Sequence, residues 1–193
     1  VLGAGILWFG WFGFNAGSAL AAGELATSAM VATHIATSAA GLSWMFVEWL
    51  KKGKPSLLGA ASGAVAGLVA ITPASGFVNP MGSLFIGLIA GVLCYLAVHL
   101  KNIFGYDESL DVVGVHAVGG ITGAILTGVF ASKEINAAGN NGLLYGNAGL
   151  LSTQILSVLV TIVFSFVMTF IILKILDKVM GLRVHEEKEF EGL

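Results

Sequence analysis

The sequence predicts an all-α protein, a polytopic bundle of transmembrane helices. Hydrophobic residues make up 56% of the 193 residues and charged residues make up 10%, against about 25% charged residues in ordinary soluble domains. The mean hydropathy is +0.92. A soluble domain of this length must present a large polar surface to water, which this composition cannot supply. The apolar residues also form uncharged runs that are long enough to cross a bilayer.

Six hydrophobic spans can be marked between charged residues and helix-breaking residues. Proline and glycine at 72–76 and 79–80 divide an uncharged run that is too long for one crossing. We expect a membrane bundle over residues 1–180 and the start of a polar C-terminal tail over residues 181–193. The predicted spans cover residues 1–22, 25–47, 57–71, 81–100, 112–131 and 143–176.

The basic residues support this number of spans, because six crossings separate them between two sides. One side then holds eight basic residues, and the opposite side holds Lys133. The positive-inside rule predicts an integral protein of the cell (inner) membrane, with the Lys-rich loops and the tail in the cytoplasm. The eight residues are Lys51, Lys52, Lys54, Lys101, Lys174, Lys178, Arg183 and Lys188.

Small residues predict close packing between the helices. The third span repeats glycine every fourth residue at 59, 63 and 67, and the fourth span does so at Gly87 and Gly91. This spacing lets helix backbones approach closely in lipid. Cys94 is the single cysteine and is expected to be a small packing residue. Asp111 directly precedes the fifth span and is predicted to cap it.

One narrow stripe of the first span combines aromatic rings with a hydroxyl group. In a helix, Leu7, Trp11, Phe14 and Ser18 fall at i, i+4, i+7 and i+11. Aromatic faces attract cations, and a hydroxyl oxygen can accept a hydrogen bond from one. The stripe could therefore line a cavity that receives a cation. Helix packing is the alternative, because glycines at 10, 13 and 17 leave gaps that aromatic rings can fill.

His116 is an ionisable residue inside the fifth span, and such a residue is a functional candidate by default. Val112 lies one helical turn before it, and Gly119 and Gly120 lie one turn after it, so it has few local partners. A neutral imidazole has one donor and one acceptor nitrogen, which suits the passage of a small hydrogen-bonding solute or a proton. A packing role, with a hydrogen bond to another helix, remains open.

His34, in the second span, is expected to have a packing or interfacial role, because Thr33 and Thr37 are polar groups near enough to satisfy it.

Several classes of function are not supported by the sequence. It contains neither Gly-x-Ser-x-Gly nor His-Glu-x-x-His, and no pair of acidic residues lies in mid-span, so an enzyme is not expected. No two histidines share metal-ligand spacing, and neither a metal nor another cofactor is expected. Nucleic acid is not an expected partner, because there is no basic patch. A solute pathway, a sensor and a scaffold remain.

Five groups of residues carry a resemblance. They are Gly-Trp-Phe-Gly-Phe-Asn-Ala-Gly-Ser at 10–18, Gly-Lys-Pro-Ser-Leu-Leu-Gly at 53–59, Gly-Leu-Val and Thr-Pro-Ala at 67–69 and 72–74, Asp-Val-Val-Gly-Val-His at 111–116, and Gly-Leu-Arg-Val at 181–184. In this order along nearly the whole chain, they resemble the ammonium transporter family (Amt/Mep/Rh), and its bacterial-type Amt branch most. The resemblance implies the C-terminal half of a member, transmembrane helices six to eleven of an eleven-helix inverted-repeat fold.

The resemblance also implies a function, the transport of ammonium or ammonia through a pore in each subunit of a homotrimer. In this family the cation is recruited at an outer vestibule, deprotonated and conducted past pore histidines. Ser18 matches the vestibule serine, Phe14 matches a phenylalanine of the gate, and His116 matches the second pore histidine. Leu7 and Val112 match apolar positions of the pore.

Other parts of the family pattern are carried less directly or are absent. Trp11 is the weakest vestibule assignment, because the family's recruiting tryptophan comes from an earlier helix. The first pore histidine, an aspartate near the ammonium site and the other gate phenylalanine belong to the first half. This chain is therefore expected to supply one half of the pore, beside the missing N-terminal half of the same protein or a companion chain.

Partners and alternatives follow from the same resemblance. The tail resembles the segment that couples subunits and receives a PII-type signalling protein. An ammonium sensor that uses the same fold without appreciable transport is the main alternative, and a structural half-bundle without a substrate is another.

Overall fold

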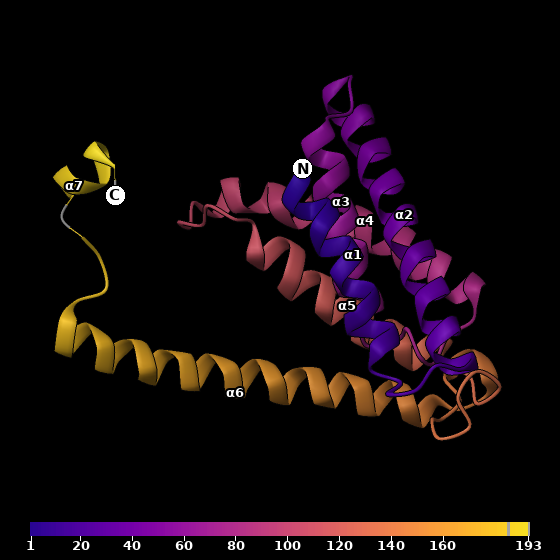
Figure 1. Cartoon of the computed structure of the whole chain (residues 1–193). Helices are drawn as coiled ribbons and strands as arrows, with labels where there is room; N and C mark the ends of the chain where they lie inside the picture. The colour runs from indigo at the N-terminus through magenta and orange to yellow at the C-terminus, as the bar shows by residue number, and fades with distance from the viewer. Residues whose placement is uncertain (185, 193) are drawn as a thin grey trace. The chain divides into compact units, whose positions relative to one another are not determined.

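The computed structural model describes residues 1–184 and 186–192, and its regular elements within them are all helical (Figure 1). His185 and Leu193 of the predicted tail lie outside the described residues. Contacts divide the chain into two units, Val1–Ile155 and Leu156–Leu193. The elements are α1 (Leu2–Gly17), α2 (Glu24–Lys52), α3 (Leu57–Ile71), α4 (Pro80–Phe104), a π-helical turn η1 (Val113–Ala117) that continues into α5 (Val118–Phe130), a 3-10 turn η2 (Leu143–Tyr145), α6 (Ala148–Met180) and α7 (Glu186–Glu191).

Each of the six predicted spans contains a helix, which confirms the all-helical membrane fold. Within the described residues, four helical segments are long and apolar enough to cross a membrane, namely α2, Pro80–Lys101 of α4, Val113–Phe130 and α6. The other two spans hold shorter helices, α1 with 16 residues and α3 with 15 residues. At 1.5 Å per residue these reach about 24 Å and about 22 Å.

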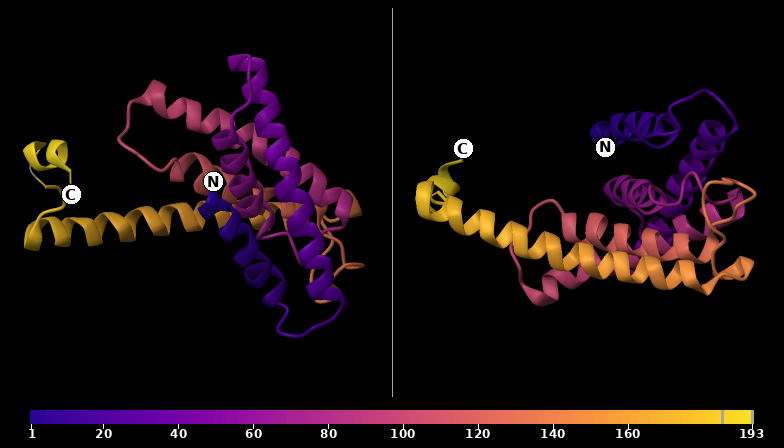
Figure 2. Two further views of the ribbon diagram at one scale, coloured as in Figure 1. Left: turned by 45° about the horizontal axis from the view of Figure 1, so that its top comes forward. Right: turned by 90° about the horizontal axis from the view of Figure 1, so that it is seen from below.

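The first span ends earlier than predicted, at Gly17 instead of residue 22. The amides of Ala19 and Leu20 bond three residues back, at 3.2 and 3.0 Å, which tightens the chain into a turn. Leu20 then has φ 57°, outside the helical region. Figure 2 shows the segment that follows as an open loop leading into α2.

The second span ends later than predicted, because Glu48 does not terminate it. Glu48 is 5% exposed, and its carboxylate accepts hydrogen bonds from the backbone N–H of Ser56 at 3.0 Å and from the Ser56 hydroxyl at 3.0 Å. Lys52 forms an ion pair with it at 3.2 Å. A buried carboxylate that is satisfied in this way needs no water, so α2 continues to Lys52. Gly53, with φ 77°, provides the left-handed residue that closes the helix.

The sixth span also differs from the prediction at both ends. Residues 143–145 form the separate turn η2, and Gly146, with φ 86°, separates this turn from the long helix. Helix α6 therefore begins at Ala148 and continues to Met180, four residues beyond the predicted end.

The core of the first unit is built where α2 packs against α3 and α4, which are the neighbours it contacts most extensively. A Cβ atom added to Gly67 would lie 2.7 Å from the Ala36 carbonyl oxygen, and one added to Gly63 would lie 2.6 Å from the Trp44 Cβ. The prediction of close glycine-mediated packing is thus confirmed. Cys94 is fully buried in a cluster with Trp44, which confirms its packing role.

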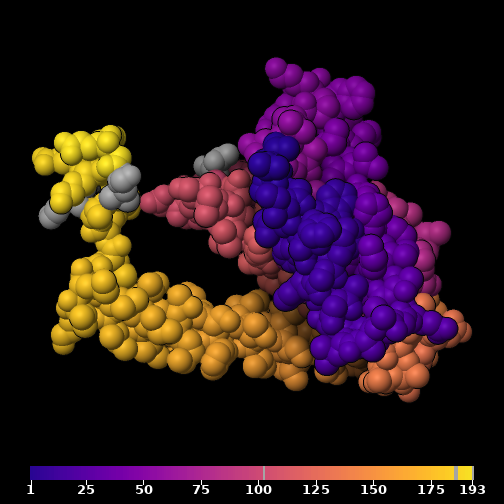
Figure 3. Space-filling model, in the orientation of Figure 1, coloured from indigo at the N-terminus to yellow at the C-terminus, as the bar shows by residue number. Residues whose placement is uncertain are grey.

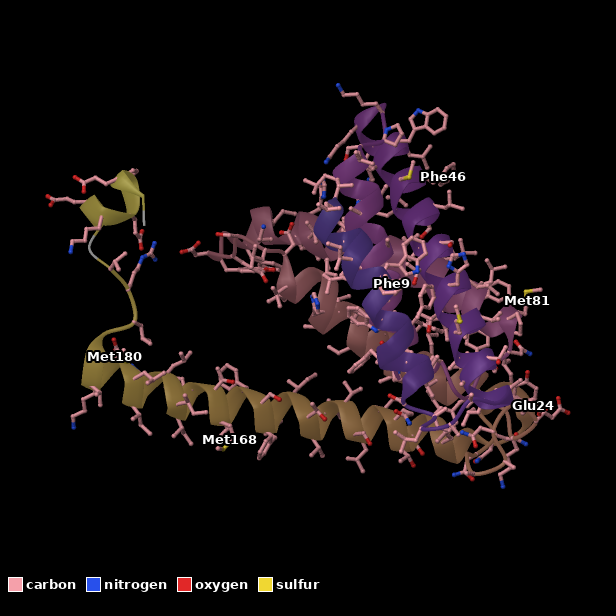
Figure 4. The ribbon with its side chains drawn as sticks, in the orientation of Figure 1. Phe9, Glu24, Phe46, Met81, Met168 and Met180 are labelled. Atoms are coloured by element: carbon pink, nitrogen blue, oxygen red, sulfur yellow. The ribbon has the colours of Figure 1, made fainter. Side chains whose placement is uncertain are left out.

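Helix α6 differs from this core, because it crosses from the first unit into the second and its residues from Leu156 onward belong to the second unit. Its side chains project from the ribbon on both sides, Met168 among them (Figure 4). Beyond α6, Arg183 of the tail forms an ion pair with Glu189 of α7, with Nε–Oε1 at 2.7 Å and Nη2–Oε2 at 3.0 Å.

Candidate functional site

Two polar contacts fix how α1 is turned against its neighbours. The indole N–H of Trp11 donates to the Thr72 hydroxyl oxygen at 2.7 Å, and the Asn15 amide donates to the Thr33 hydroxyl oxygen at 3.0 Å. Both threonine hydroxyls donate in turn to carbonyl oxygens of their own segments, at 2.8 and 2.7 Å. Their oxygens are therefore left to accept from α1, which lies over its neighbours in the space-filling view (Figure 3).

A cavity of about 360 Å³ lies at the C-terminal end of α1. It brings together Phe14 and Ser18, two of the three residues predicted for the vestibule. The remaining wall comes from the start of α2, the loop after α3 and residue 136. The lining residues are Phe14, Asn15, Ser18, Ala19, Leu25, Ala29, Thr72, Ser75, Gly76, Phe77 and Asn136.

The chemistry of this cavity suits a hydrogen-bond donor with a positive charge. The Ser18 hydroxyl donates its proton to the Phe14 carbonyl oxygen, so its lone pairs remain available as acceptors. Asn15 is 6% exposed and uses its N–H group on Thr33, so its amide oxygen remains as a second acceptor. The rings of Phe14 and Phe77 add faces that attract cations.

A second, smaller cavity of about 190 Å³ contains His116. Its wall combines the N-terminal ends of α1 and α3 with the segment that leads into α5. His116 is exposed within this chain. A histidine in the middle of a membrane span is expected to be buried in protein, and this chain alone does not bury it. The lining residues are Val1, Ala4, Leu58, Ala61, Ser62, Val65, Leu110, Asp111, Val115 and His116.

The turn that carries His116 is π-helical over Val113–Ala117. Gly114 allows this turn to lie against α4, because a Cβ atom at that position would be 2.6 Å from a methyl group of Val98. A π-helical turn inside a helix is frequently found at a functional site. This turn could not be predicted from the sequence, since Val-Gly-Val-His-Ala is equally compatible with an α-helix.

Asp111 does not cap the fifth span with its side chain, which corrects the prediction. Its carboxylate forms an ion pair with Lys101, and its backbone has φ 54°. The free amide of Val113 is satisfied by Glu108, whose Oε1 accepts from it at 2.6 Å. The local sequence offers three acidic residues, at 107, 108 and 111, and only the loop conformation decides which of them caps the turn.

Three predicted site residues lie elsewhere. Leu7 and Val112 are 53% and 45% exposed, and neither is among the described residues that line the two cavities. Trp11 is also not among them, and its indole is held by Thr72. The pore roles of Leu7 and Val112 and the vestibule role of Trp11 stay predictions. Asn15 and Thr72 were missed, although Asn15 directly follows Phe14 in the sequence.

His34 packs against aromatic rings of α1. Its ring centroid lies 5.4 Å from that of Trp8 and 5.9 Å from that of Phe12. The hydroxyls of Thr33 and Thr37 do not donate to it, but to backbone oxygens one turn earlier, at 2.7 and 2.6 Å. The packing role expected for His34 agrees with these ring contacts.

Comparison with known sequences gives a consistent result. An ammonium transporter of Aquifex aeolicus is 60% identical over 191 residues, which is 98% of this chain and 45% of that protein. An ammonium transporter of Bacillus subtilis is 50% identical over 193 residues, which is 100% of this chain and 48% of that protein. The chain thus spans about half the length of the curated relatives it matches.

Solved structures show the same fold. The crystal structure of Saccharomyces cerevisiae Mep2 matches with a TM-score of 0.93 and 34% identity, over 97% of this chain and 44% of that chain. A protein described as a sensor Amt protein matches with a TM-score of 0.88 and 33% identity, over 99% of this chain and 46% of that chain. The family model described as the Ammonium Transporter Family matches residues 1–193. Since the match extends over the whole sequence, this chain belongs to the ammonium transporter family.

Proposed function

We propose that the protein containing this chain transports ammonium or ammonia across a membrane, and that this chain supplies one half of the pore. The observation that carries the proposal is the cavity around Ser18, where acceptor oxygens and aromatic faces lie together. Ammonium is a small cation with four N–H donors, and such a site offers it both kinds of contact. The names of the relatives support this choice of substrate.

The second cavity supplies the next step of the proposal. A cation that leaves the vestibule has to lose a proton before it crosses an apolar path, because an ion is costly to transfer into a membrane interior. His116 lines the second cavity, and a neutral imidazole there can accept and donate at its two nitrogens. Leu7 and Val112 are the apolar positions proposed to lie along the path between the recruiting end and this histidine.

Assembly belongs to the same proposal. The exposed imidazole of His116 supports a partner half, the N-terminal half of the same protein or a companion chain. We propose a homotrimer in the cell membrane, with the Lys-rich loops and the tail in the cytoplasm and with the tail as the site for a PII-type protein.

Two substitutions in the complete protein test this function. His116→Ala should change ammonium or methylammonium flux, or the charge moved with it, by about tenfold or more, because a proton-transferring group is lost. Ser18→Leu should raise the half-saturating ammonium concentration about fivefold, because one hydrogen bond to the cation is lost. Uptake of labelled methylammonium into proteoliposomes, together with the current, measures both effects.

The controls use residues of the same types outside the two cavities. His99→Ala removes an exposed histidine whose ring stacks on that of Tyr95, with the ring centroids 4.7 Å apart. Ser152→Leu removes an exposed serine that, like Ser18, donates to a backbone oxygen of its own helix, at 2.9 Å. Both should leave transport as in the parent. A His116→Ala protein with unchanged flux, selectivity and current would remove the histidine from the proposed pathway.

The similarity to a sensor Amt protein supports one alternative, ammonium sensing with the same fold. The Ser18 cavity would then bind ammonium without passing it on. Binding that Ser18→Leu weakens, in a protein that shows no flux into proteoliposomes, would favour the sensor.

A further inference from the structure

Three charged residues hold the backbone at the point where the π-helical turn of His116 begins. We call Lys101, Glu108 and Asp111 the Lys101 clamp. Lys101, near the end of α4, donates to the Glu108 backbone oxygen at 2.9 Å and forms an ion pair with the Asp111 carboxylate. Glu108 in turn accepts from the Val113 amide, at 2.6 Å. The clamp therefore connects α4 to the first residue of the turn.

The backbone of Asp111 is held in an uncommon conformation by these contacts. Its φ of 54° lies in the left-handed region, which is unfavourable for a residue other than glycine, although Asp tolerates it better than most. Its carbonyl oxygen nevertheless accepts from the Val115 amide at 2.9 Å and so starts the helical hydrogen bonding. Such a conformation persists only where the surrounding contacts fix it, and it is often found where geometry serves a function.

The phase of the turn decides where the His116 side chain lies. A π-helical turn contains one residue more than an α-helical turn, so an exchange of one for the other rotates the following side chains around the helix. Gly114 against Val98 fixes the same turn from its other side. Asp111 and His116 line one cavity, so a change at the clamp is transmitted over a single turn.

We infer that the Lys101 clamp positions His116 for its part in conduction, with Lys101 and Asp111 as positioning residues that act through the backbone of the turn. The inference rests on the proposed transport function for the use of His116. The clamp would set the register of the turn, and thereby direct the imidazole to the cavity of about 190 Å³.

The test compares Lys101→Met and Asp111→Asn with Lys101→Arg and Lys133→Met in the complete protein. Asn keeps the shape of Asp and its tolerance of positive φ, but it removes the charge. Arg at 101 keeps the ion pair. Lys133 is exposed in the loop after α5 and serves as the matched control.

Two readouts are needed, one of which does not depend on transport. The ¹⁵N imidazole signal of His116, assigned by its loss in His116→Ala, should shift in Lys101→Met and Asp111→Asn and stay unchanged in the other two variants. Maximal flux per folded molecule should fall about tenfold in the same two variants. The half-saturating concentration should stay as in the parent, because Ser18 lies in the other cavity.

Each outcome has one meaning. Lower thermal stability with an unchanged His116 signal and unchanged flux would overturn the inference and leave the clamp as a structural contact. Glu108→Gln retains an acceptor for the Val113 amide, so an unchanged His116 signal in this protein supports the hydrogen bond between Glu108 and Val113 as part of the clamp. An unchanged His116 signal in Asp111→Asn contradicts the inference. If the parent protein itself shows no flux, the transport function fails, and the imidazole signal alone still decides the positioning role.

Discussion

The α2–α3–α4 core and α6 are both apolar and helical, but they use their apolar residues in opposite ways. In the core, glycine and alanine bring backbones together, and Ala36, Ala70 and Ala90 are fully buried. Helix α6 is richer in large apolar side chains, and from Leu156 to Met180 it contains neither glycine nor alanine. In a membrane the surrounding lipid is as apolar as leucine, so apolarity alone does not drive helices together. Close fit between small residues drives helices together instead.

The largest difference in stability is expected when the same substitution, isoleucine to alanine, is made in both regions. Ile71 is fully buried in α3, whereas Ile162 of α6 is 47% exposed. Ile71→Ala should lower the unfolding free energy of the complete protein by about 2–5 kcal/mol, because it leaves a cavity. Ile162→Ala should lower it by about 0.5 kcal/mol or less, as at a surface position. Thermal unfolding in detergent measures both. A large loss at Ile162 would show that the other half of the protein covers this face of α6.

A smaller effect is expected from adding one methyl group where backbones touch. A Cβ atom at Gly67 would lie 2.7 Å from both the Ala36 carbonyl oxygen and the Ala40 Cβ. Gly67→Ala should therefore cost about 1–3 kcal/mol through overpacking. Gly120→Ala in α5, where no atom lies within 4 Å, is the matched control. It should be neutral or stabilising by up to about 1 kcal/mol, since alanine favours a helix. Equal unfolding temperatures for the two variants would contradict close packing at Gly67.

The smallest effect is expected in the tail, outside both regions. A hydrogen bond from Arg183 holds the pKa of the Glu189 carboxyl below its ordinary value, with a further contribution from the charge of Arg183. Because the pKa is lowered in the folded state, the contact stabilises the tail above the ordinary pKa of glutamate and is lost as the pH falls through the lowered value. The NMR signal of the Arg183 Nε–H should follow this titration. Glu191→Gln should leave it unchanged, whereas a signal insensitive to pH would refute the contact.

Much of the fold could be predicted because hydrophobic runs and their breaks are local properties. The third span was predicted at residues 57–71, the bounds that α3 has. The ends were predicted less well where a contact distant in sequence decides them. Glu48 resembles the end of a span in the sequence, but Ser56, which directly precedes the next helix, satisfies its charge and the helix continues. The early end of the first helix at Gly17, followed by a turn at Ala19 and Leu20, has no comparable signal in the sequence.

The candidate site divides in the same way. The sequence indicated Phe14, Ser18 and His116, because a stripe of one helix and an ionisable residue in a span can be recognised along the chain. It did not indicate that Asn15 would reach Thr33 of the next helix, or that Trp11 would bond to Thr72. Such bonds depend on how α1 is rotated against its neighbours, and no residue of α1 alone specifies that rotation.

The sequence by itself determined that this is an α-helical membrane protein, where its spans lie and which residue types are unusual within them, because burial in lipid acts on each segment separately. Only the tertiary structure decided which of those residues share a cavity and that the His116 turn is π-helical. It also decided that Glu108, and not Asp111, satisfies the free amide of that turn. The physical reason is that these features depend on the fit of side chains from different helices, which the order of residues in any one helix leaves open.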